Sequence, residues 1–209
     1  MHYRAVALSQ VDGAGGESIA AGLAERLGFG YLNEAVIARV AADQGLDPAT
    51  VADAERRRSF VERLTHATAL GGLDGIASAP LYPVDQTDAI LALIRDAVRD
   101  AADGGDVVLV GHAASFACAD RPDVLRVCVT APFDSRVPRV AEAQGITEKE
   151  ATKLLRQSDA GRASYLKRVY GVDGESPTDY DLVVNMARLD SDSAIDVVLV
   201  LVKAPDDLC

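Results

Sequence analysis

The chain lacks any apolar run long enough to span a membrane, and its first residues, Met1-His2-Tyr3-Arg4, have no signal-peptide architecture. It has only three cysteines, odd in number and far apart: Cys118, Cys128 and Cys209. This usage indicates a reducing compartment and argues against a disulfide framework or a cysteine-based metal site. None of the three histidines has a second ligand at a metal-binding spacing. We therefore expect a cytoplasmic protein with no membrane segment and no metal site built from its own side chains.

The chain is also poor in positive charge: 21 lysines and arginines stand against 32 aspartates and glutamates, a formal net charge of -11. An acidic surface argues against nucleic acid as a partner, because such binding depends on basic patches. A small nucleotide remains compatible with this balance, since a pocket can be locally basic. With 209 residues, 49% of them hydrophobic, the chain is long enough for one domain with a sizeable core.

A glycine-rich stretch between Leu8 and Ser18 is the feature around which the chain is organised. The apolar run before it predicts a buried strand, and a helical pattern begins near Ser18. Three glycines within four residues let the backbone turn closely and direct N–H groups inward: Gly13, Gly15 and Gly16. The N-terminus of the following helix adds partial positive charge. An ordinary tight turn is the alternative, but the order of strand, glycine turn and helix favours a cradle for phosphate.

The loop lacks the side chains of a full phosphate loop, whose pattern is G-x-x-x-x-G-K-[S/T]. Gly15 aligns with the second glycine of that pattern. At the other positions Gln10 replaces the first glycine, Gly16 the lysine and Glu17 the hydroxyl residue. The backbone N–H groups of the cradle are therefore retained, but its lysine is not. Glu17 and Ser18 have a second interpretation, because acids and hydroxyls also stabilise the start of a helix.

Strand and helix patterns alternate along the chain, which predicts a parallel α/β sheet. The predicted strands cover residues 3–8, 29–32, 107–110, 124–129 and 182–184. The predicted helices start near residue 18, cover 85–102 and 134–143, start again at the capping box of Thr147, and continue after Gly161 to Tyr170. Residues 191–203 also fit a buried strand, but their apolar spacing and Asp190 as N-cap favour a helix.

Ligands of parallel sheets bind at the carboxyl ends of the strands. Two segments meet that condition, the loop after Leu8 and the pair Gly111-His112 after the strand 107–110. Each of these two segments is therefore a candidate for the functional site.

Six segments, in their order and spacing, resemble the cytidylate kinase-like family of P-loop proteins. No single segment is specific, but together they extend over nearly the whole chain. They are Ser9…Gly13-Ala14-Gly15-Gly16, Phe29-Gly30-Tyr31-Leu32-Asn33-Glu34, Val108-Leu109-Val110-Gly111-His112-Ala113, Arg126-Val127-Cys128-Val129-Thr130-Ala131-Pro132, Asp159-Ala160-Gly161-Arg162-Ala163-Ser164-Tyr165 and Tyr180-Asp181-Leu182-Val183-Val184-Asn185.

The resemblance implies one P-loop NTPase domain over residues 1–209, with a three-layer α/β/α fold and a parallel central sheet. It also implies a helical acceptor-binding insert over about residues 34–84 and a basic lid over about residues 150–172. The implied reaction is phosphoryl transfer from ATP, with Mg²⁺, to CMP, dCMP or a related nucleoside monophosphate. The implied partner is thus a small nucleotide, and a homodimer is compatible with the assignment.

The same resemblance implies roles for individual residues. The ATP phosphates would lie on Asp12, Gly13, Ala14, Gly15, Gly16, Glu17 and Ser18. The acceptor would contact Tyr31, Asn33 and Arg136. Catalysis would fall to Arg162, Arg156 and His112, with Arg162 reaching the transferring phosphate.

These side chains also have structural interpretations. Tyr31 fits core packing, Asn33 fits a helix N-cap, and a lone histidine such as His112 is commonly satisfied by its surroundings. Arg156 and Arg162 fit a solvated helix face paired to carboxylates. The concentration of positive charge near them, in an otherwise acidic chain, favours the lid interpretation.

The chain departs from the family pattern Ser-Arg-Gln-x-Gly-Ser-Gly-Gly-Arg and from its later Gly-Arg. Gln10, Glu17 and His112 each stand where the family has an arginine, and Asn33 where it has an aspartate. A carboxylate beside a triphosphate is unfavourable unless Mg²⁺ lies between them. Two functions therefore compete: an active nucleoside monophosphate kinase, and a catalytically degenerate relative that binds nucleotide or another anion as a sensor or partner module. A P-loop phosphotransferase with a non-nucleotide acceptor is a third.

Overall fold

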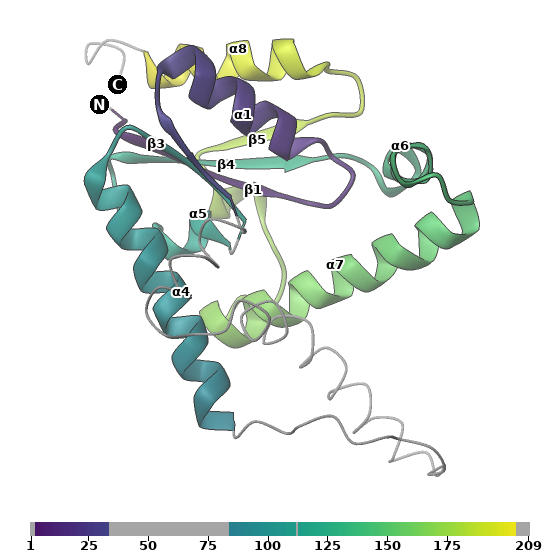
Figure 1. The fold of residues 1–209 in the computed structure, drawn as a ribbon, viewed down its shortest axis with the longest axis horizontal. Helices are drawn as coiled ribbons and strands as arrows, with labels where there is room; N and C mark the ends of the chain where they lie inside the picture. Colours follow the sequence, from purple (N-terminus) through teal and green to yellow (C-terminus); the bar gives the residue numbers. More distant parts are fainter. Residues whose placement is uncertain (1–2, 34–83, 112, 204–209) are drawn as a thin grey trace.

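The computed structural model describes residues 3–33, 84–111 and 113–203. The predicted helical insert, except for its last residue, and His112 lie outside these residues. The described chain forms a five-stranded, fully parallel sheet in the order β2-β3-β1-β4-β5 (Figure 1). The strands are β1 (Ala5–Gln10), β2 (Gly30–Leu32), β3 (Val107–Val110), β4 (Val124–Thr130) and β5 (Leu182–Asn185).

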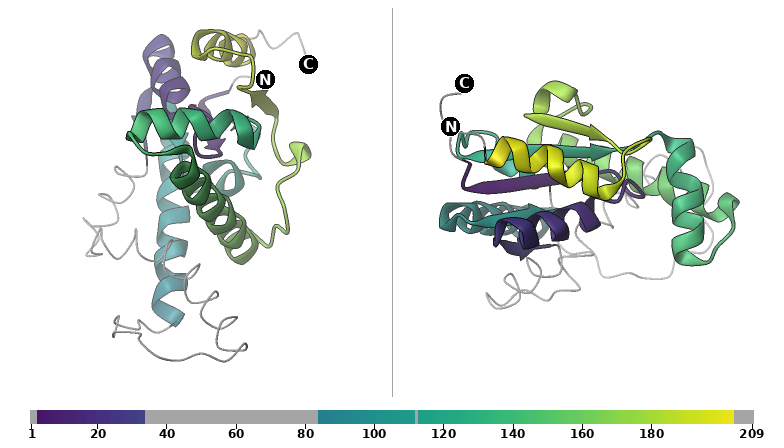
Figure 2. Two further views of the ribbon diagram at one scale, coloured as in Figure 1. Left: turned by 90° about the vertical axis from the view of Figure 1, so that its right-hand side faces the viewer. Right: turned by 90° about the horizontal axis from the view of Figure 1, so that it is seen from above.

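Helices cover both faces of the sheet, which makes three layers (Figures 1 and 2). One face is covered by α1 (Gly16–Leu27) and α8 (Ser191–Val202), and the other by α4 (Val84–Gly104), α5 (Ala114–Ala117) and α7 (Glu148–Tyr170). The helix α6 (Phe133–Gln144) follows the carboxyl end of β4, and a short 3-10 helix, η1 (Pro177–Asp179), precedes β5. This is the α/β fold that the sequence predicts. Of the described helices, none combines the length and the apolar character that a membrane span needs.

The central strand β1 divides its side chains between the two layers. Val6 and Leu8 are fully buried on the side of α1 and α8, whereas Ala5 and Ala7 are fully buried on the side of α4 and α5. Because β1 pairs with β3 on one side and β4 on the other, its residues Ala5–Ser9 are buried and only Gln10 is partly exposed. The loop that follows it is therefore anchored to the buried centre of the sheet.

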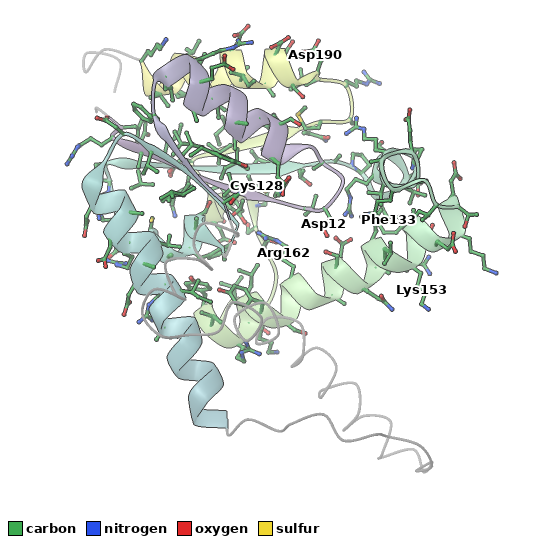
Figure 3. All side chains as sticks on the ribbon, viewed as in Figure 1. Asp12, Cys128, Phe133, Lys153, Arg162 and Asp190 are labelled. Atoms are coloured by element: carbon green, nitrogen blue, oxygen red, sulfur yellow. The ribbon has the colours of Figure 1, made fainter. Side chains whose placement is uncertain are left out.

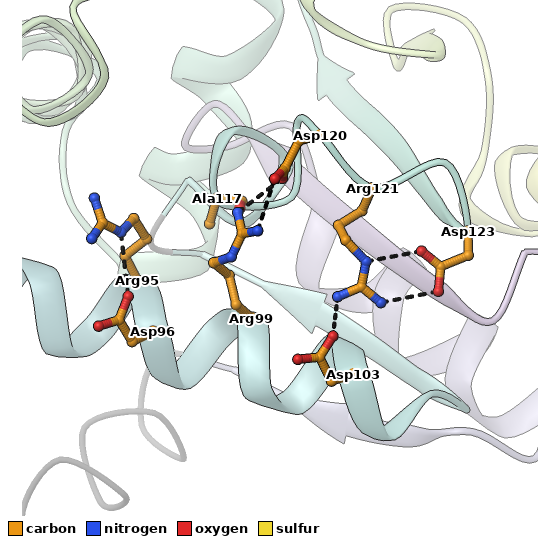
Figure 4. A network of polar contacts seen from close by, with 8 residues as sticks. All are labelled: Arg95, Asp96, Arg99, Asp103, Ala117, Asp120, Arg121 and Asp123. Atoms are coloured by element: carbon orange, nitrogen blue, oxygen red, sulfur yellow. Dashed lines mark hydrogen bonds and ion pairs between the residues drawn. The ribbon is translucent and has the colours of Figure 1, made fainter.

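An ion-pair network fixes α4 to the connection between α5 and β4 (Figure 4). Arg99 donates to both carboxylate oxygens of Asp120, at 2.8 Å each, and to the carbonyl of Ala117 at 2.8 Å. Arg121 binds Asp123 with two hydrogen bonds of 2.9 and 3.0 Å and also contacts Asp103 on α4. The Asp120 and Asp103 carboxylates lie at the surface, so their pairs orient α4 rather than supply much stability, whereas the Arg121–Asp123 pair is partly buried.

The helix boundaries follow local signals that the sequence carries. Gly28 ends α1 with a left-handed φ of 70°, and the predicted capping box of Thr147 and Glu150 starts α7. Residues 191–202 form the predicted helix, and the Asp190 side chain accepts a hydrogen bond from Ser193 N at 2.8 Å. The strand–helix ambiguity of this segment is thereby resolved.

Most boundaries agree with the prediction to within one or two residues, and three differences concern the glycine loop and the predicted lid. The first strand covers residues 5–10 rather than 3–8, because β4 continues to pair with β1 as far as Gln10. The first helix starts at Gly16 rather than near Ser18. The lid segment is one continuous helix that passes through Gly161, since the buried residues Leu155 and Leu166 anchor it on both sides of that glycine.

Candidate functional site

The glycine loop has the backbone shape of an anion cradle. Gly13 and Gly15 adopt left-handed φ values of 77° and 86°, and Gly15 is the N-cap of α1. No side chain caps this end of α1 among the described residues, so the first N–H groups of the helix are not taken up by the loop itself. A Cβ built on Gly15 would meet nothing within 4 Å, so the cradle is open on that side.

The other side of the loop is packed tightly on α6. A Cβ at Gly13 would lie 2.8 Å from Val140 Cγ2 and 3.1 Å from Arg136 Cβ. Ala14 is buried, and its N–H donates to the carbonyl of Val11 at 3.1 Å. The loop is therefore packed against α6 at Gly13 and stabilised by its own turn between Val11 and Ala14. The side of Gly15 stays open for a ligand.

The side chain of Gln10 occupies the space next to Gly16. A Cβ at Gly16 would lie 2.5 Å from Gln10 Oε1 and 2.8 Å from Gln10 Cβ. Gly16 is the position where a full phosphate loop has its lysine. The two departures from the phosphate-loop pattern are thus coupled in space: Gln10 fits only because residue 16 has no side chain.

Arg136, predicted to contact the acceptor, is buried and joins three elements. Its Nη1 donates to the carbonyl of Asp12 in the loop at 3.0 Å, and its Nη1 and Nη2 bind the carboxylate of Asp159 on α7 at 2.9 and 2.7 Å. Ser158 Oγ, also on α7, donates to the carboxylate of Asp12. The lid helix is therefore tied directly to the glycine loop.

Arg156, the second predicted lid arginine, extends to solvent beside the ring of Phe133. Its Cζ lies 5.9 Å from the ring centroid, and the Cζ of Arg136 lies 5.3 Å from the same centroid. A ring that faces two guanidinium groups stabilises their charge by cation–π attraction. Phe133 was not among the predicted site residues, because a lone phenylalanine in an amphipathic helix carries no functional signal.

Arg162, the predicted catalytic arginine, points from α7 toward the sheet (Figure 3). Its Nε and Nη2 bind the two carboxylate oxygens of Glu175 at 2.7 Å each, and the hydroxyl of Tyr180 donates to the same carboxylate. Burial alone would lower the pKa of Arg162, but the hydrogen bonds and charge of Glu175 outweigh it and raise that pKa. The same pairing outweighs the burial of Glu175 and lowers the pKa of its carboxyl group. Burial, followed by the hydrogen bond to Glu175, raises the pKa of Tyr180.

Tyr31 and Asn33 lie at the carboxyl end of β2, at the same edge of the sheet as the loop. Burial, followed by the negative charge of Glu17, raises the pKa of Tyr31, and a side-chain hydrogen bond with Asn33 partly offsets this. Glu17 and Ser18 are exposed in the first turn of α1, and neither forms a capping hydrogen bond. Tyr31 therefore lies within electrostatic range of an acidic side chain of the loop.

The turn after β3 is the second predicted segment, and its His112 lies outside the described residues. On either side of that position, Gly111 and Ala113 have left-handed φ values of 90° and 52°. Ser115, just beyond, donates from its hydroxyl to the carbonyl of Ala7 at 2.8 Å and accepts from Ser9 Oγ at 3.1 Å. These bonds join α5 to β1, so the turn after β3 adjoins the strand that carries the glycine loop.

A model of the cytidylate kinase-like family matches residues 5–188. The chain belongs to this family. A cytidylate kinase of Natronomonas pharaonis is 26% identical over 205 residues, which cover 97% of this chain and 92% of that protein. A cytidylate kinase of Methanopyrus kandleri is 33% identical over 107 residues, which cover 47% of this chain and only 55% of that protein.

Solved structures of low identity share the fold of this family member. An uncharacterised protein from Eubacterium ventriosum superposes with a TM-score of 0.70 at 19% identity and covers 96% of this chain and 99% of that one. A shikimate kinase from Bacteroides thetaiotaomicron superposes with a TM-score of 0.55 at 14% identity, over 95% of this chain and 98% of that one. The predicted kinase-type α/β/α fold is confirmed.

Proposed function

We propose that this protein is an ATP-dependent nucleoside monophosphate kinase with CMP, dCMP or a close relative as acceptor. The observation that carries the proposal is the glycine loop, which leaves the N-terminus of α1 without a side-chain cap at the carboxyl end of the central strand. The family assignment and the cytidylate kinases among the relatives support the same conclusion.

In this proposal the backbone N–H groups of residues 13–18 hold the phosphates of ATP, on the open side of Gly15. Mg²⁺ neutralises part of the phosphate charge when bound, and it would be held largely by phosphate oxygens. The described residues contain no group of three or more histidine, cysteine, aspartate or glutamate side chains that is arranged to hold a metal ion. Asp12, Glu17 and Ser18 are the carboxylate and hydroxyl side chains of residues 12–18.

Catalysis in phosphoryl transfer is mostly positioning and charge neutralisation. Arg162 is the side chain proposed to contact the transferring phosphoryl group. Arg156 is proposed to add positive charge from the exposed side of α7. Tyr31 and Asn33 are proposed to orient the acceptor. For Arg136 we propose an indirect role, because both of its terminal nitrogens are already bound to Asp159 and one also to Asp12.

A coupled assay of ADP release with ATP and Mg²⁺ tests the proposal across CMP, dCMP, UMP and AMP. We expect turnover with the cytidine nucleotides, reduced at least about a hundredfold in Arg162→Met. Arg26→Met is the matched control. Arg26 also binds carboxylates, those of Asp192 and Asp196 on α8, but it lies in the last turn of α1, at the opposite end of that helix from the glycine loop. Folded wild-type protein without turnover on any acceptor would contradict the proposal.

A second function has its own supporting observation. Gln10 fills the space beside residue 16, and Glu17 adds a carboxylate to the first turn of α1, so the loop has lost positive charge. A degenerate relative that binds nucleotide or another anion without transferring phosphate fits that loss. Thermal-shift titration with ATP, CTP and CMP separates the two functions, because stabilisation without turnover supports the second. If no nucleotide stabilises the protein, the kinase function is contradicted, the second function is restricted to another anion, and a structural or interaction role gains support.

A further inference from the structure

Glu175 lies in the connection between α7 and η1, where no sequence pattern marks it. Both of its carboxylate oxygens are engaged. Oε2 accepts from Arg162 Nε at 2.7 Å, and Oε1 accepts from Arg162 Nη2 at 2.7 Å and from the hydroxyl of Tyr180. A two-point bond between a carboxylate and a guanidinium fixes the plane of the arginine as well as its place.

The carboxylate is itself held in place from two directions. Tyr180 is only 7% exposed, and its ring packs edge-to-face on Phe116 of α5, with centroids 5.7 Å apart and planes at 78°. On the other side, Ser176 begins the capping box of η1, in which its N–H donates to Asp179 Oδ2 at 2.7 Å. Glu175 is thus a side chain on a rigid support and not a mobile counter-ion.

The pair is largely shielded from water, because the side chains of Arg162 and Glu175 are 20% and 24% exposed. Separating a shielded pair leaves an uncompensated charge, which is strongly unfavourable. An incoming phosphate is therefore expected to bind Arg162 without displacing Glu175. The two-point bond uses Nε and Nη2 and leaves Nη1 outside the pair for another oxygen.

Arg162 also lies on the helix face that is tied to the loop. Asp159, three positions earlier on α7, binds Arg136, which in turn donates to the carbonyl of Asp12. Positions three apart on a helix share a face, so Arg162 lies on the same side of α7 as Asp159, and Figure 3 shows Arg162 pointing toward the sheet.

We propose that Glu175 is a positioning residue: anchored by Tyr180, it holds the Nε–Nη2 edge of Arg162 so that Nη1 meets the transferring phosphoryl group. This inference rests on the proposed phosphoryl transfer. An acidic residue thus supports a site that must bind anions, because it orients Arg162 and not because of its own charge.

Steady-state kinetics of the full chain test this role. In Glu175→Gln, which keeps the size and one acceptor oxygen, we expect kcat to fall about tenfold. The KM for ATP should not rise, because removing a negative charge does not weaken attraction to a triphosphate. Glu175→Ala should lose more than Glu175→Gln, and Tyr180→Phe should shift kcat in the same direction. A higher kcat in Glu175→Gln, or a higher KM with unchanged kcat, would overturn the proposal.

Asp173→Asn is the matched control in the same connection. Asp173 also binds a cation of α7, Lys167, at 2.6 Å, but the two side chains are 69% and 77% exposed. This exposed pair should leave kcat and KM unchanged. If Asp173→Asn lowers kcat as much as Glu175→Gln does, the effect comes from the connection as a whole and the proposed role of Glu175 is wrong.

Nitrogen-15 arginine NMR provides a readout that does not need turnover. The Arg162 Nε proton, assigned with Arg162→Lys, should exchange slowly in the wild type and quickly in Glu175→Ala. On addition of inorganic tripolyphosphate it should stay protected while the Nη1 resonance shifts. Loss of Nε protection on that addition, or no response from any Arg162 proton, overturns the inference. If the wild type shows no turnover, the proposed function fails, and these spectra then decide only whether Glu175 orients Arg162 toward a bound phosphate.

Discussion

The side chain of Gln10 lies across Gly16, so that a Cβ on residue 16 would stand 2.5 Å from Gln10 Oε1 and 2.8 Å from Gln10 Cβ. Because Gln10 Cβ is fixed to the strand, rotation of the glutamine side chain relieves only one of these contacts. The absence of the phosphate-loop lysine at position 16 and the presence of glutamine at position 10 are therefore coupled. A side chain at position 16 requires a smaller residue at position 10.

Gly16→Ala is expected to lower the free energy of unfolding by about 1–3 kcal/mol, since it overpacks the start of α1. In a Gln10→Gly background the same substitution should be neutral or stabilising, because the obstructing atoms are gone. Gly161→Ala is the control: a Cβ there meets nothing within 4 Å, so it should stabilise by about 0.4–1 kcal/mol. Urea unfolding measures all of these variants. Equal destabilisation by Gly16→Ala in both backgrounds would show that Gln10 is not the cause.

Arg136→Met is expected to destabilise the protein by about 1.5–3 kcal/mol, because it removes the charge-assisted hydrogen bonds to Asp159 and the hydrogen bond to the carbonyl of Asp12. The Arg136 side chain is 6% exposed and that of Asp159 is 34% exposed. Arg26→Met, which removes an exposed pair with Asp192, should cost at most about 1 kcal/mol. Chemical denaturation compares the two, and similar losses would show that the Arg136 pair behaves as a surface pair.

Glu17→Arg, which returns the cation of the family pattern, is expected to tighten ATP binding about tenfold. The change replaces repulsion of the phosphates by a charge-assisted hydrogen bond. It should also lower the pKa of Tyr31, since the charge of Glu17 contributes to raising it. Glu25→Arg, at an exposed position near the other end of α1, controls for net charge. Isothermal titration calorimetry measures the affinity for ATP. An equal gain in affinity in both variants would show that the effect comes from the net charge of the protein.

Stability is expected to fall between pH 9 and pH 11. Burial raises the pKa of Cys118 from 9.0 to about 11, and burial followed by the charge of Glu175 raises the pKa of Cys128 to about 11. A group whose pKa is raised by folding contributes its full stabilisation below its unfolded pKa and loses it as the pH rises through the folded value. The double variant Cys118→Ala/Cys128→Ala, in a Cys209→Ser background, should show a shallower alkaline decline in urea unfolding. An unchanged decline would assign it to the tyrosines instead.

Much of the fold could be predicted because its signals are local. The buried run Val107–Val110 is a strand with the predicted bounds, and Thr147 with Glu150 starts α7 as a capping box. The strand order and the extension of β1 to Gln10 could not be predicted, because both depend on pairing between segments far apart in the chain. The cytidylate kinase-like assignment followed from the order of several segments, none of them sufficient alone.

The candidate site was less predictable than the fold. The sequence proposed its residues from their positions but did not predict their partners: Arg136 binds Asp159, and Arg162 binds Glu175. Glu175 stands in a polar connection with no periodicity, and only the turn after Gly171 brings it back alongside α7. Partners of this kind depend on the angle between an element and its connection, which residue patterns do not encode. The roles predicted for all of the site residues, those of the loop and of Arg162 included, stay predictions.

The place of β1 at the centre of the sheet also has a consequence for how the protein forms. This strand is made first, yet Ala5 pairs with Val107 on one side and Val124 on the other, more than a hundred positions later. During synthesis the glycine loop therefore emerges long before the strands that support it. Pairings of such separation slow folding and expose apolar segments meanwhile. A ribosome-bound fragment that ends before β4 should not bind nucleotide, however complete its loop sequence.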